Sequence, residues 1–162
     1  VGGVDVYSNY SFRSSHLNSQ GKHFYIKKGM NHFDGGEALA YSRERYAYSA
    51  GDRQRVKNQQ QVLEAIIKKI STNKSILLKY DELLSSFSSL YRTDIPNSVI
   101  KDYIKMQIDD MSSWTIKTQS LDGSGTYSRT YTAPDHEQYV MIPYESTIKS
   151  ARSRINSVMN GK

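Results

Sequence analysis

Residues 41–70 read YSRERYAYSAGDRQRVKNQQQVLEAIIKKI, an arginine-rich segment followed directly by an apolar run. On a helix that begins near Gly51, positions three and four residues apart fall on one stripe. This stripe starts with polar residues and continues with apolar residues that we expect to be buried; in order, they are Asp52, Arg55, Gln59, Leu63, Ile66 and Ile70. The buried face of the helix is therefore predicted to become polar at its N-terminal end.

Charge on a buried helix stripe needs a compensating partner, because an unpaired guanidinium taken out of water loses much of its hydration free energy. A helix N-terminus presents free N–H groups and a partial positive charge, which suits phosphate. Arg43 and Arg45 lie two residues apart, so in an extended segment their side chains leave the same side, roughly 7 Å from each other. Because guanidinium groups bind phosphate oxygens in bidentate fashion, Arg43, Arg45 and Arg55 are predicted to converge on one headgroup, and two forks on one face suit a pyrophosphate.

The segment ALAYSRERYAYSAGDRQRVKNQQ, residues 38–60, together with the opening VGGVDV, resembles the LytR-CpsA-Psr family, and most of all its streptococcal capsule branch. The motif combines an aromatic residue, Arg-x-Arg, Asp-x-x-Arg and Asn-Gln-Gln at fixed spacing, and the combination is far more specific than any one part. The resemblance implies an enzyme that attaches glycopolymers carried on undecaprenyl pyrophosphate to peptidoglycan. It also implies arginines around the pyrophosphate and a Mg²⁺ ion as cofactor.

The resemblance assigns headgroup binding to four residues of the motif: Arg43, Arg45, Arg55 and Gln59. The three arginines, together with Asp52 at the acidic position of the motif, are expected to be catalytic. Many family members carry a further arginine where Asn58 stands, whereas the capsule branch has asparagine there, as this chain does. The resemblance assigns no metal ligand within this chain.

The family domain begins well before the Val-Gly-Gly-Val element, and its earlier half supplies aspartates and arginines that hold the metal and the phosphates. The resemblance therefore implies that residues 1–162 are a single-domain fragment, the C-terminal two-thirds of the catalytic domain. The N-terminal remainder of the domain would then be a partner, and the fragment alone would be a poor catalyst. The expected location is the extracellular face of the cell membrane, with the anchor outside this chain.

Composition and charge agree with a soluble domain fragment that prefers anionic partners. No run approaches the eighteen or so consecutive apolar residues of a spanning helix. There is no cysteine, which excludes disulfides and thiolate metal sites. The net charge of +6 suits lipid phosphates, cell-wall polymers or nucleic acid alike. The resemblance selects a polyprenyl-pyrophosphate glycan donor and a peptidoglycan acceptor, and no nucleic acid.

The pattern of apolar residues and turn formers predicts alternating strands and helices. Strands are expected at 1–6, 23–28, 114–121 and 139–143, and helices at 34–40, 51–71, 75–90, 96–108 and 144–159. Asp34 is expected to cap the first helix. The Ser-, Asn- and Gly-rich segments 7–22 and 122–134 are predicted as loops. The predicted fold class is α/β, a layered domain with a central mixed β-sheet flanked by helices, which the resemblance makes an incomplete LytR-CpsA-Psr domain.

The candidate site residues also have simpler interpretations. Asp52 can cap the helix or pair with Arg55 three residues further on, and as a carboxylate it can be an oxygen ligand of Mg²⁺. Arg43 and Arg45 can be solvated surface charge, and the family motif favours the site over that interpretation. These alternatives remain open in the sequence.

The other polar residues of the segment are given structural roles. Gln59 can be an inward polar residue, whereas Lys57, Gln60 and Gln61 are expected to face solvent. Glu44 is expected to point away from its two arginine neighbours and to form a salt bridge elsewhere.

Aromatic and apolar residues outside the motif are predicted to pack in the core. The chain has thirteen tyrosines, several beside the arginines, which can also stack on sugar rings or line a lipid channel. Ile100, Ile104 and Ile108 have the same two interpretations, core packing first and a channel wall second. The four histidines show no metal-ligand spacing, and no nucleophile triad or phosphate-binding glycine loop is present.

Three functions fit the sequence. The favoured one is a phosphotransferase-type ligase, in which arginines stabilise the charge that develops as the bond to the leaving lipid phosphate breaks, with Mg²⁺ assisting. A hydrolase that cleaves the same pyrophosphate with water is the second. The third is a noncatalytic regulator that binds an anionic polymer, and its affinity should fall steeply between about 50 and 200 mM salt.

Overall fold

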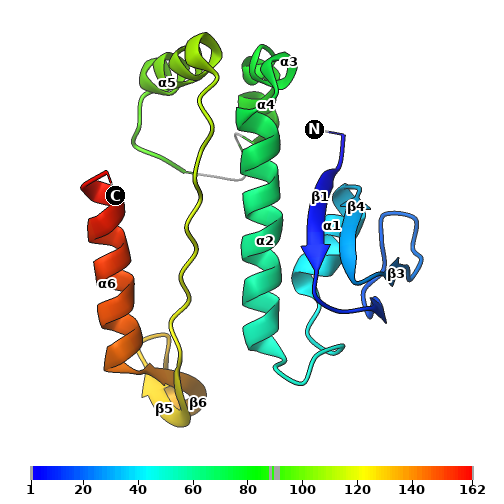
Figure 1. Cartoon of the computed structure of the whole chain (residues 1–162). Coiled ribbons are helices and arrows are strands. Elements are labelled where there is room, and N and C mark those ends of the chain that lie inside the picture. Colours follow the sequence, from blue (N-terminus) through cyan, green and yellow to red (C-terminus); the bar gives the residue numbers. More distant parts are fainter. Residues whose placement is uncertain (1, 88, 90–91, 162) are drawn as a thin grey trace. The chain divides into compact units, whose positions relative to one another are not determined.

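The protein, seen here in a computed structural model, divides into two compact units, Val1–Ile116 and Lys117–Lys162 (Figure 1). The structure describes residues 2–87, 89 and 92–161. The first unit contains β1 (Val4–Ser8), β2 (Phe12–Arg13), β3 (Tyr25–Ile26), β4 (Gly29–Phe33), α1 (Gly35–Arg43), α2 (Asp52–Ser71), α3 (Lys74–Leu77), α4 (Tyr80–Phe87) and α5 (Asn97–Asp110). The second unit contains β5 (Gly123–Thr130), β6 (Ala133–Pro143) and α6 (Glu145–Met159). The expectation of a single-domain fragment stays a prediction.

The mixed α/β fold class is confirmed, with helices beside small β-ladders. Within the described residues the strands pair as three antiparallel two-stranded ladders, β1 with β4, β2 with β3 and β5 with β6, rather than in one mixed sheet. Along β1, Val4, Val6 and Ser8 are buried and alternate with exposed residues. This period of two is the pattern of a ladder with one face against a core.

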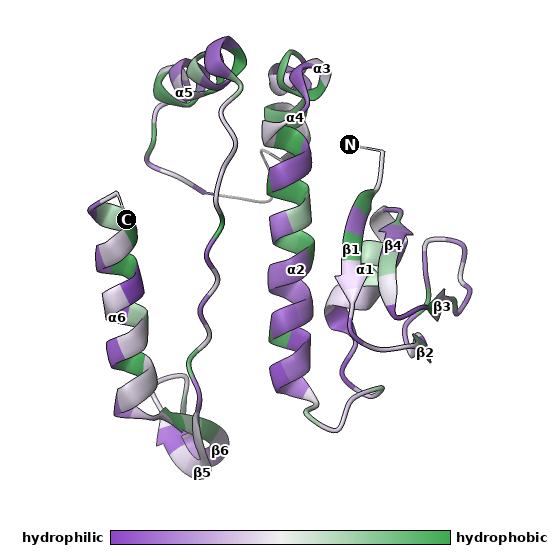
Figure 2. Ribbon diagram, in the orientation of Figure 1, coloured by the Kyte–Doolittle hydropathy of each residue, from purple (hydrophilic) through white to green (hydrophobic). Residues whose placement is uncertain are grey.

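The core of the first unit lies where the β1–β4 ladder meets α1 and α2. Its buried members are Val4, Val6, Ile26, Phe33, Ala38, Tyr41 and Val62. Figure 2 shows that α2 is mostly hydrophilic over its N-terminal half and carries more hydrophobic residues over its C-terminal half. Because these side chains come from segments far apart in sequence, their burial fixes both helices on the ladder.

Asp34 caps helix α1, as predicted, and forms a capping box with Glu37, which was not predicted. The Asp34 side chain accepts a hydrogen bond from the Glu37 N–H at 2.8 Å, and the Glu37 side chain accepts one from the Asp34 N–H at 3.2 Å. The helix continues to Arg43 instead of ending near Ala40. The prediction that Arg43 and Arg45 share an extended segment is therefore wrong, because Arg43 is helical and only the following residue, Glu44, is extended.

The predicted long helix is confirmed as α2, but its inward stripe is different. The buried residues are Gln54, Asn58, Val62 and Ser71, whereas Leu63 is 57% exposed. The inward face is polar at its N-terminal end, as predicted, yet other side chains supply that polarity. The predicted stripe was displaced by one residue, about 100° around the helix, because Val62 and Leu63 are both apolar and either could face the core.

Two predictions around the middle of the chain are corrected. The single helix expected at 75–90 is two helices, α3 and α4, and position 90 lies outside the described residues. The helix expected at 96–108 is confirmed as α5, with Pro96 as its N-cap. Residues 114–121, predicted as a strand, have no regular secondary structure, because none of the ladders in the described residues includes them.

The remaining corrections concern strands. The second strand was expected at 23–28, but the chain there forms only the short β3, and β4 follows without having been predicted. The segment 122–134, predicted as a loop, contains β5. Its glycines suit this strand, because a Cβ at Gly125 would collide with the Tyr139 side chain on β6. Among the described helices, none combines the length and apolar composition that crossing a bilayer requires.

Candidate anion-binding site

The candidate site residues flank the connection between α1 and α2. Arg43 is the last residue of α1, and Arg45 follows it by two positions. Asp52 is the first residue of α2, and Arg55 lies in its first turn. Arg43, Arg45 and Asp52 are exposed, whereas the Arg55 side chain is only 36% exposed. The two ends of one short connection therefore carry the three predicted arginines.

Arg55 is held by the ion pair that its spacing predicts. Its Nη2 lies 2.5 Å from Oδ1 of Asp52. Its Nε is buried and makes no hydrogen bond within the part of the chain that the structure describes. An unmade hydrogen bond of a buried donor costs about 1–3 kcal/mol, so the ion pair with Asp52 does not satisfy this guanidinium completely. Asp52 is not the N-cap of α2, because Gly51, with a φ of 49°, occupies that position.

Arg43 and Arg45 are exposed, and neither forms a direct ion pair with a carboxylate among the described residues. The Nη2 atom of Arg45 donates to the Tyr46 hydroxyl at 2.7 Å, and its guanidinium carbon lies 4.7 Å from the centre of that ring. This hydrogen bond raises the pKa of Arg45 above its already high usual value. Within the described ranges, no carboxylate forms an ion pair with Arg43 or Arg45. Both cations are therefore available to an anion from outside.

Glu44, the acid between these arginines, is fully buried. Its carboxylate accepts hydrogen bonds from the N–H and hydroxyl of Ser15, at 2.6 and 2.7 Å, and from the N–H groups of Arg45, Tyr46 and Ala47, at 3.0, 3.0 and 3.2 Å. Burial alone would raise the pKa of Glu44, but these hydrogen bonds outweigh it and hold the pKa below its usual value. The predicted salt bridge is wrong, because N–H and O–H groups, not a cation, satisfy this carboxylate.

Asn58 lies at the polar end of the inward face of α2 and is completely buried. Its Nδ2 donates to the Tyr41 carbonyl at 3.1 Å and to the Tyr48 hydroxyl at 3.2 Å, and its Oδ1 accepts from Gln54 at 3.1 Å. Burial raises the pKa of the Tyr48 hydroxyl. Asn58 therefore ties α2 both to the last turn of α1 and to the middle of the connection.

Gln59 and Gln61 differ from the predicted orientations, and headgroup binding by Gln59 stays a prediction. Gln59, predicted to bind the headgroup or to point inward, is exposed on α2. Gln61, predicted to face solvent, accepts a hydrogen bond from the Tyr41 hydroxyl at 3.0 Å and donates to the Tyr7 carbonyl at 3.2 Å. The i, i+4 series of residues 54, 58 and 62 is the signal in the sequence that could have identified the correct inward face.

An apolar pocket of about 430 Å³ lies beside α1 and α2. Ser42, which precedes Arg43, is among its lining residues, and so is Leu39, which is 50% exposed. The other lining residues are Gly2, Gly3, Val4, Phe33, Asp34, Gly35, Ala38, Val62 and Ile66. The isoleucines of α5 do not line it. A hydrocarbon group next to the end of α1 would find apolar surface here.

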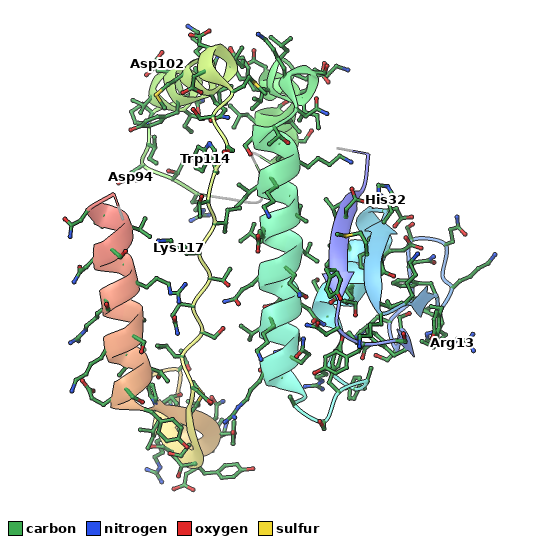
Figure 3. The ribbon with its side chains drawn as sticks, viewed as in Figure 1. Arg13, His32, Asp94, Asp102, Trp114 and Lys117 are labelled. Carbon is green, nitrogen blue, oxygen red and sulfur yellow. The ribbon has the colours of Figure 1, made fainter. Side chains whose placement is uncertain are left out.

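The described residues do not form a metal site by themselves. Over residues 2–87, 89 and 92–161, no three His, Cys, Asp or Glu side chains gather to hold a metal ion. Asp52 is already paired with Arg55. His32, on β4 (Figure 3), pairs instead with Asp5 across the ladder, at 2.7 Å. The Mg²⁺ ion that the resemblance implies would need ligands beyond these residues.

Comparison with known proteins identifies the family of this chain. The family model described as the LytR_cpsA_psr family matches residues 1–147. The chain belongs to the LytR-CpsA-Psr family. The resemblance carried by residues 38–60 and the opening VGGVDV is thereby confirmed.

Two named relatives are about one-third identical to this chain over the residues that align. Polyisoprenyl-teichoic acid–peptidoglycan teichoic acid transferase TagV of Bacillus subtilis is 34% identical over 128 residues, which are 78% of this chain and 32% of that protein. Biofilm regulatory protein A of Streptococcus mutans is 33% identical over 166 aligned residues, which cover 100% of this chain and 38% of the relative. The chain therefore spans less than two-fifths of the length of these relatives.

Solved structures place the fold in the same family. The crystal structure of B. subtilis TagV matches with a TM-score of 0.65 and 28% identity, over 96% of this chain and 56% of that one. Protein gbs0355 from Streptococcus agalactiae matches with a TM-score of 0.61 and 25% identity, over 90% of this chain and 47% of that one. The chain corresponds to about half of each solved structure.

The lowered pKa of Glu44 predicts how stability depends on pH. Because the folded-state pKa lies below the usual value of 4.5, the carboxylate stabilises the fold above that value, and this contribution is lost as the pH falls through the folded-state pKa. Glu44→Gln lacks the titration. We expect the stability advantage of the wild type over Glu44→Gln, measured by urea denaturation, to shrink as the pH falls below 4.5.

The control for this measurement is Glu137→Gln, which removes the same charge from an exposed position on β6. Measured over the same pH range, it reports the effect of removing one exposed negative charge. A constant difference between wild type and Glu44→Gln from about pH 7 to pH 3 would contradict a lowered pKa.

Proposed function

We propose that the protein transfers a wall or capsular glycopolymer from polyprenyl pyrophosphate to peptidoglycan, with Arg43, Arg45 and Arg55 binding the pyrophosphate. The transferase names of TagV and its relatives support this class of reaction. One observation carries the proposal for the site: three arginines flank one connection, and the only acid between the first two is turned into the protein.

Electrostatics favour a dianionic headgroup at this connection. Arg43 and Arg45 are exposed and form no ion pair with a carboxylate among the described residues, and the Arg55 side chain is partly exposed. Gly51 contributes no side-chain cap to α2, although the Arg53 N–H of the first turn already donates to the Ala50 carbonyl at 3.1 Å; the partial positive charge of the helix N-terminus still favours an anion there. The ion pair with Asp52 uses only one nitrogen of the Arg55 guanidinium. Arginine can bind two phosphate oxygens at once, which suits a pyrophosphate.

The proposed reaction is the transfer of a phosphorus-linked glycan. The acceptor hydroxyl of peptidoglycan attacks the phosphorus that carries the glycan, and the bond from that phosphorus to the bridging oxygen breaks. The electron pair leaves with the polyprenyl phosphate, and the hydroxyl proton goes to a base that is not assigned to a residue of this chain. The arginines stabilise the charge that develops on the bridging and nonbridging oxygens.

The apolar pocket beside α1 is our candidate for the start of the polyprenyl chain. Ser42 of its lining precedes Arg43 in the sequence, so the pocket and Arg43 share the last turn of α1. Burial of hydrocarbon stabilises a complex by about 25 cal/mol per Å². The two parts of an amphipathic donor would thus be bound by adjacent parts of α1.

The proposal includes partners that lie outside the described residues. We place the reaction at the extracellular face of the cell membrane and expect the N-terminal remainder of the domain to complete the site. Mg²⁺ would neutralise phosphate charge when bound, and its ligands would come from that remainder, because the residues described here form no ligand cluster. Asp52 is the one site carboxylate that could contribute an oxygen.

Product analysis distinguishes transfer from its alternatives. The full-length protein is incubated with a lipid-linked glycan and a soluble peptidoglycan fragment, and products are identified by mass spectrometry. We expect a glycan joined to peptidoglycan by a phosphodiester and one polyprenyl phosphate for each glycan transferred. Free glycan phosphate without any linked product would identify a hydrolase, and unchanged donor would identify a noncatalytic binder.

Removal of single arginines tests the headgroup site. Arg43→Ala and Arg55→Ala in the full-length protein should each weaken the binding of geranyl pyrophosphate about ten- to a hundredfold, because each removes charge-assisted hydrogen bonds. Binding is measured by isothermal titration calorimetry at fixed salt. Arg13→Ala is the control, since Arg13 is exposed on β2 and its side chain points away from α1 and α2 (Figure 3). Undiminished binding in both Arg43→Ala and Arg55→Ala would end the proposal.

A charge in the apolar pocket tests the lipid site. Leu39→Asp should weaken the binding of a long-chain prenyl pyrophosphate about tenfold, because the aspartate must lose hydration when hydrocarbon enters the pocket. Binding of inorganic pyrophosphate should be unaffected. Leu78→Asp, at another exposed leucine outside the pocket, is the control. Equal loss for the prenyl and inorganic ligands would show that the pocket does not receive the chain.

A further inference from the structure

Glu44 is a buried carboxylate at the site that the proposed mechanism does not use. It lies between Arg43 and Arg45 in the sequence, yet its carboxylate contacts neither guanidinium. A buried carboxylate is strongly unfavourable unless hydrogen bonds compensate it. Here the compensation comes from N–H and O–H groups alone. The buried carboxylate therefore fixes the backbone of the segment that connects α1 and α2.

We infer that Glu44 is a positioning residue, which holds the backbone around Arg43 and Arg45 so that both guanidinium groups remain unpaired and face the pyrophosphate. The inference rests on the proposed function and adds a residue to it. Glu44 does not touch the donor. It acts through the two arginines that flank it.

The hydrogen bonds of Glu44 define the turn that follows α1. Its Oε1 accepts from three successive N–H groups, those of Arg45, Tyr46 and Ala47. Three N–H groups directed at one oxygen fix the backbone of the turn, and with it the direction in which the Arg45 side chain leaves. Glu44 thereby acts as an internal anion around which the connection is folded.

A second segment of the chain clamps the same place from outside. Ser15, 29 residues earlier, donates its N–H and its hydroxyl to the Glu44 carboxylate. The ring of the next residue, His16, lies 3.1 Å from the Arg43 carbonyl oxygen through its Nε2. The Arg43 backbone therefore lies against His16, and the Arg45 backbone is linked to Ser15 through the Glu44 carboxylate. A site held at two points loses less freedom when a ligand binds.

The inward orientation also preserves the charge of the site. A solvent-exposed carboxylate between two arginines would pair with them, and an incoming phosphate would have to break those pairs. The partner that Arg45 has instead is the neutral hydroxyl of Tyr46. A phosphate oxygen is a stronger hydrogen-bond acceptor for a guanidinium than a neutral hydroxyl is. The pyrophosphate of the lipid-linked glycan can therefore replace Tyr46 as the partner of Arg45.

The substitution Glu44→Gln tests the role of the carboxylate's charge and acceptor oxygens, because it changes both and leaves the size of the side chain almost unchanged. Glu44→Gln keeps the volume of the side chain, but its NH₂ group would face N–H donors, and one of the two acceptor oxygens is lost. We expect Glu44→Gln in the full-length protein to bind geranyl pyrophosphate about tenfold more weakly than the wild type. Glu137→Gln, with the same loss of charge at an exposed site, should bind within about twofold of the wild type.

A double-mutant cycle tests whether Glu44 acts through the arginines. In the Arg43→Ala/Arg45→Ala background, Glu44→Gln should change the affinity by less than about twofold, because the groups that it positions are gone. An equal effect in both backgrounds would mean that Glu44 only stabilises the fold, and would overturn the inference. The unfolding midpoint of each variant, measured in parallel, must lie above the assay temperature.

The outcomes separate this inference from the proposed function. If Arg43→Ala/Arg45→Ala loses affinity while Glu44→Gln binds like the wild type, the inference fails and the proposed function stands. If Arg43→Ala/Arg45→Ala binds undiminished, the proposed function fails and the inference with it. Should Glu44→Gln not fold, Ser15→Ala removes one hydroxyl donor and leaves the carboxylate. It should weaken binding about threefold, with the same dependence on the arginines, and unchanged affinity would overturn the inference.

Discussion

The buried amide of Asn58 is the interaction on which the arrangement of α1 and α2 depends. One side chain satisfies a carbonyl at the end of α1, a hydroxyl in the connection and an amide one turn back on α2. A buried amide is tolerated only when its hydrogen bonds are made, so α2 can lie against α1 in one rotational setting. An apolar residue at the same point would permit sliding, since the hydrophobic effect is not directional.

Two buried polar side chains thus hold the connection at separate places. Asn58 binds its middle through Tyr48, and Glu44 binds its beginning through three N–H groups. The arginines between and beside these points remain at the surface. The buried side chains of Asn58 and Glu44 therefore fix the conformation of this strongly basic segment. The exposed guanidinium groups of Arg43 and Arg45 are not needed for that purpose and can bind a ligand.

Features that depend on residues close in sequence were predicted correctly, whereas features that depend on contacts between residues far apart in sequence were not. The cap at Asp34 and the bounds of α2 follow from residues a few positions apart, and so does the pair of Asp52 with Arg55. The inward face of α2 was misjudged because Val62 and Leu63 are equally apolar and the choice belongs to α1 and the ladder. The role of Glu44 was missed because its partner Ser15 lies 29 residues away, within a segment that shows no periodic pattern. The site arginines were predicted from the spacing of the family motif, which can be read directly in the sequence.

Three of the donors that surround Glu44 belong to the backbone, which has a consequence for sequence variation. Substitutions at positions 46 and 47 leave these N–H groups in place, with proline as the sole exception, whereas Arg45 is needed for its own side chain. The connection can therefore vary at positions 46 and 47 while the hydrogen bonds to Glu44, and with them the geometry of the turn, are kept. Tolerance of substitution is in this way built into the part of the chain nearest the proposed chemistry.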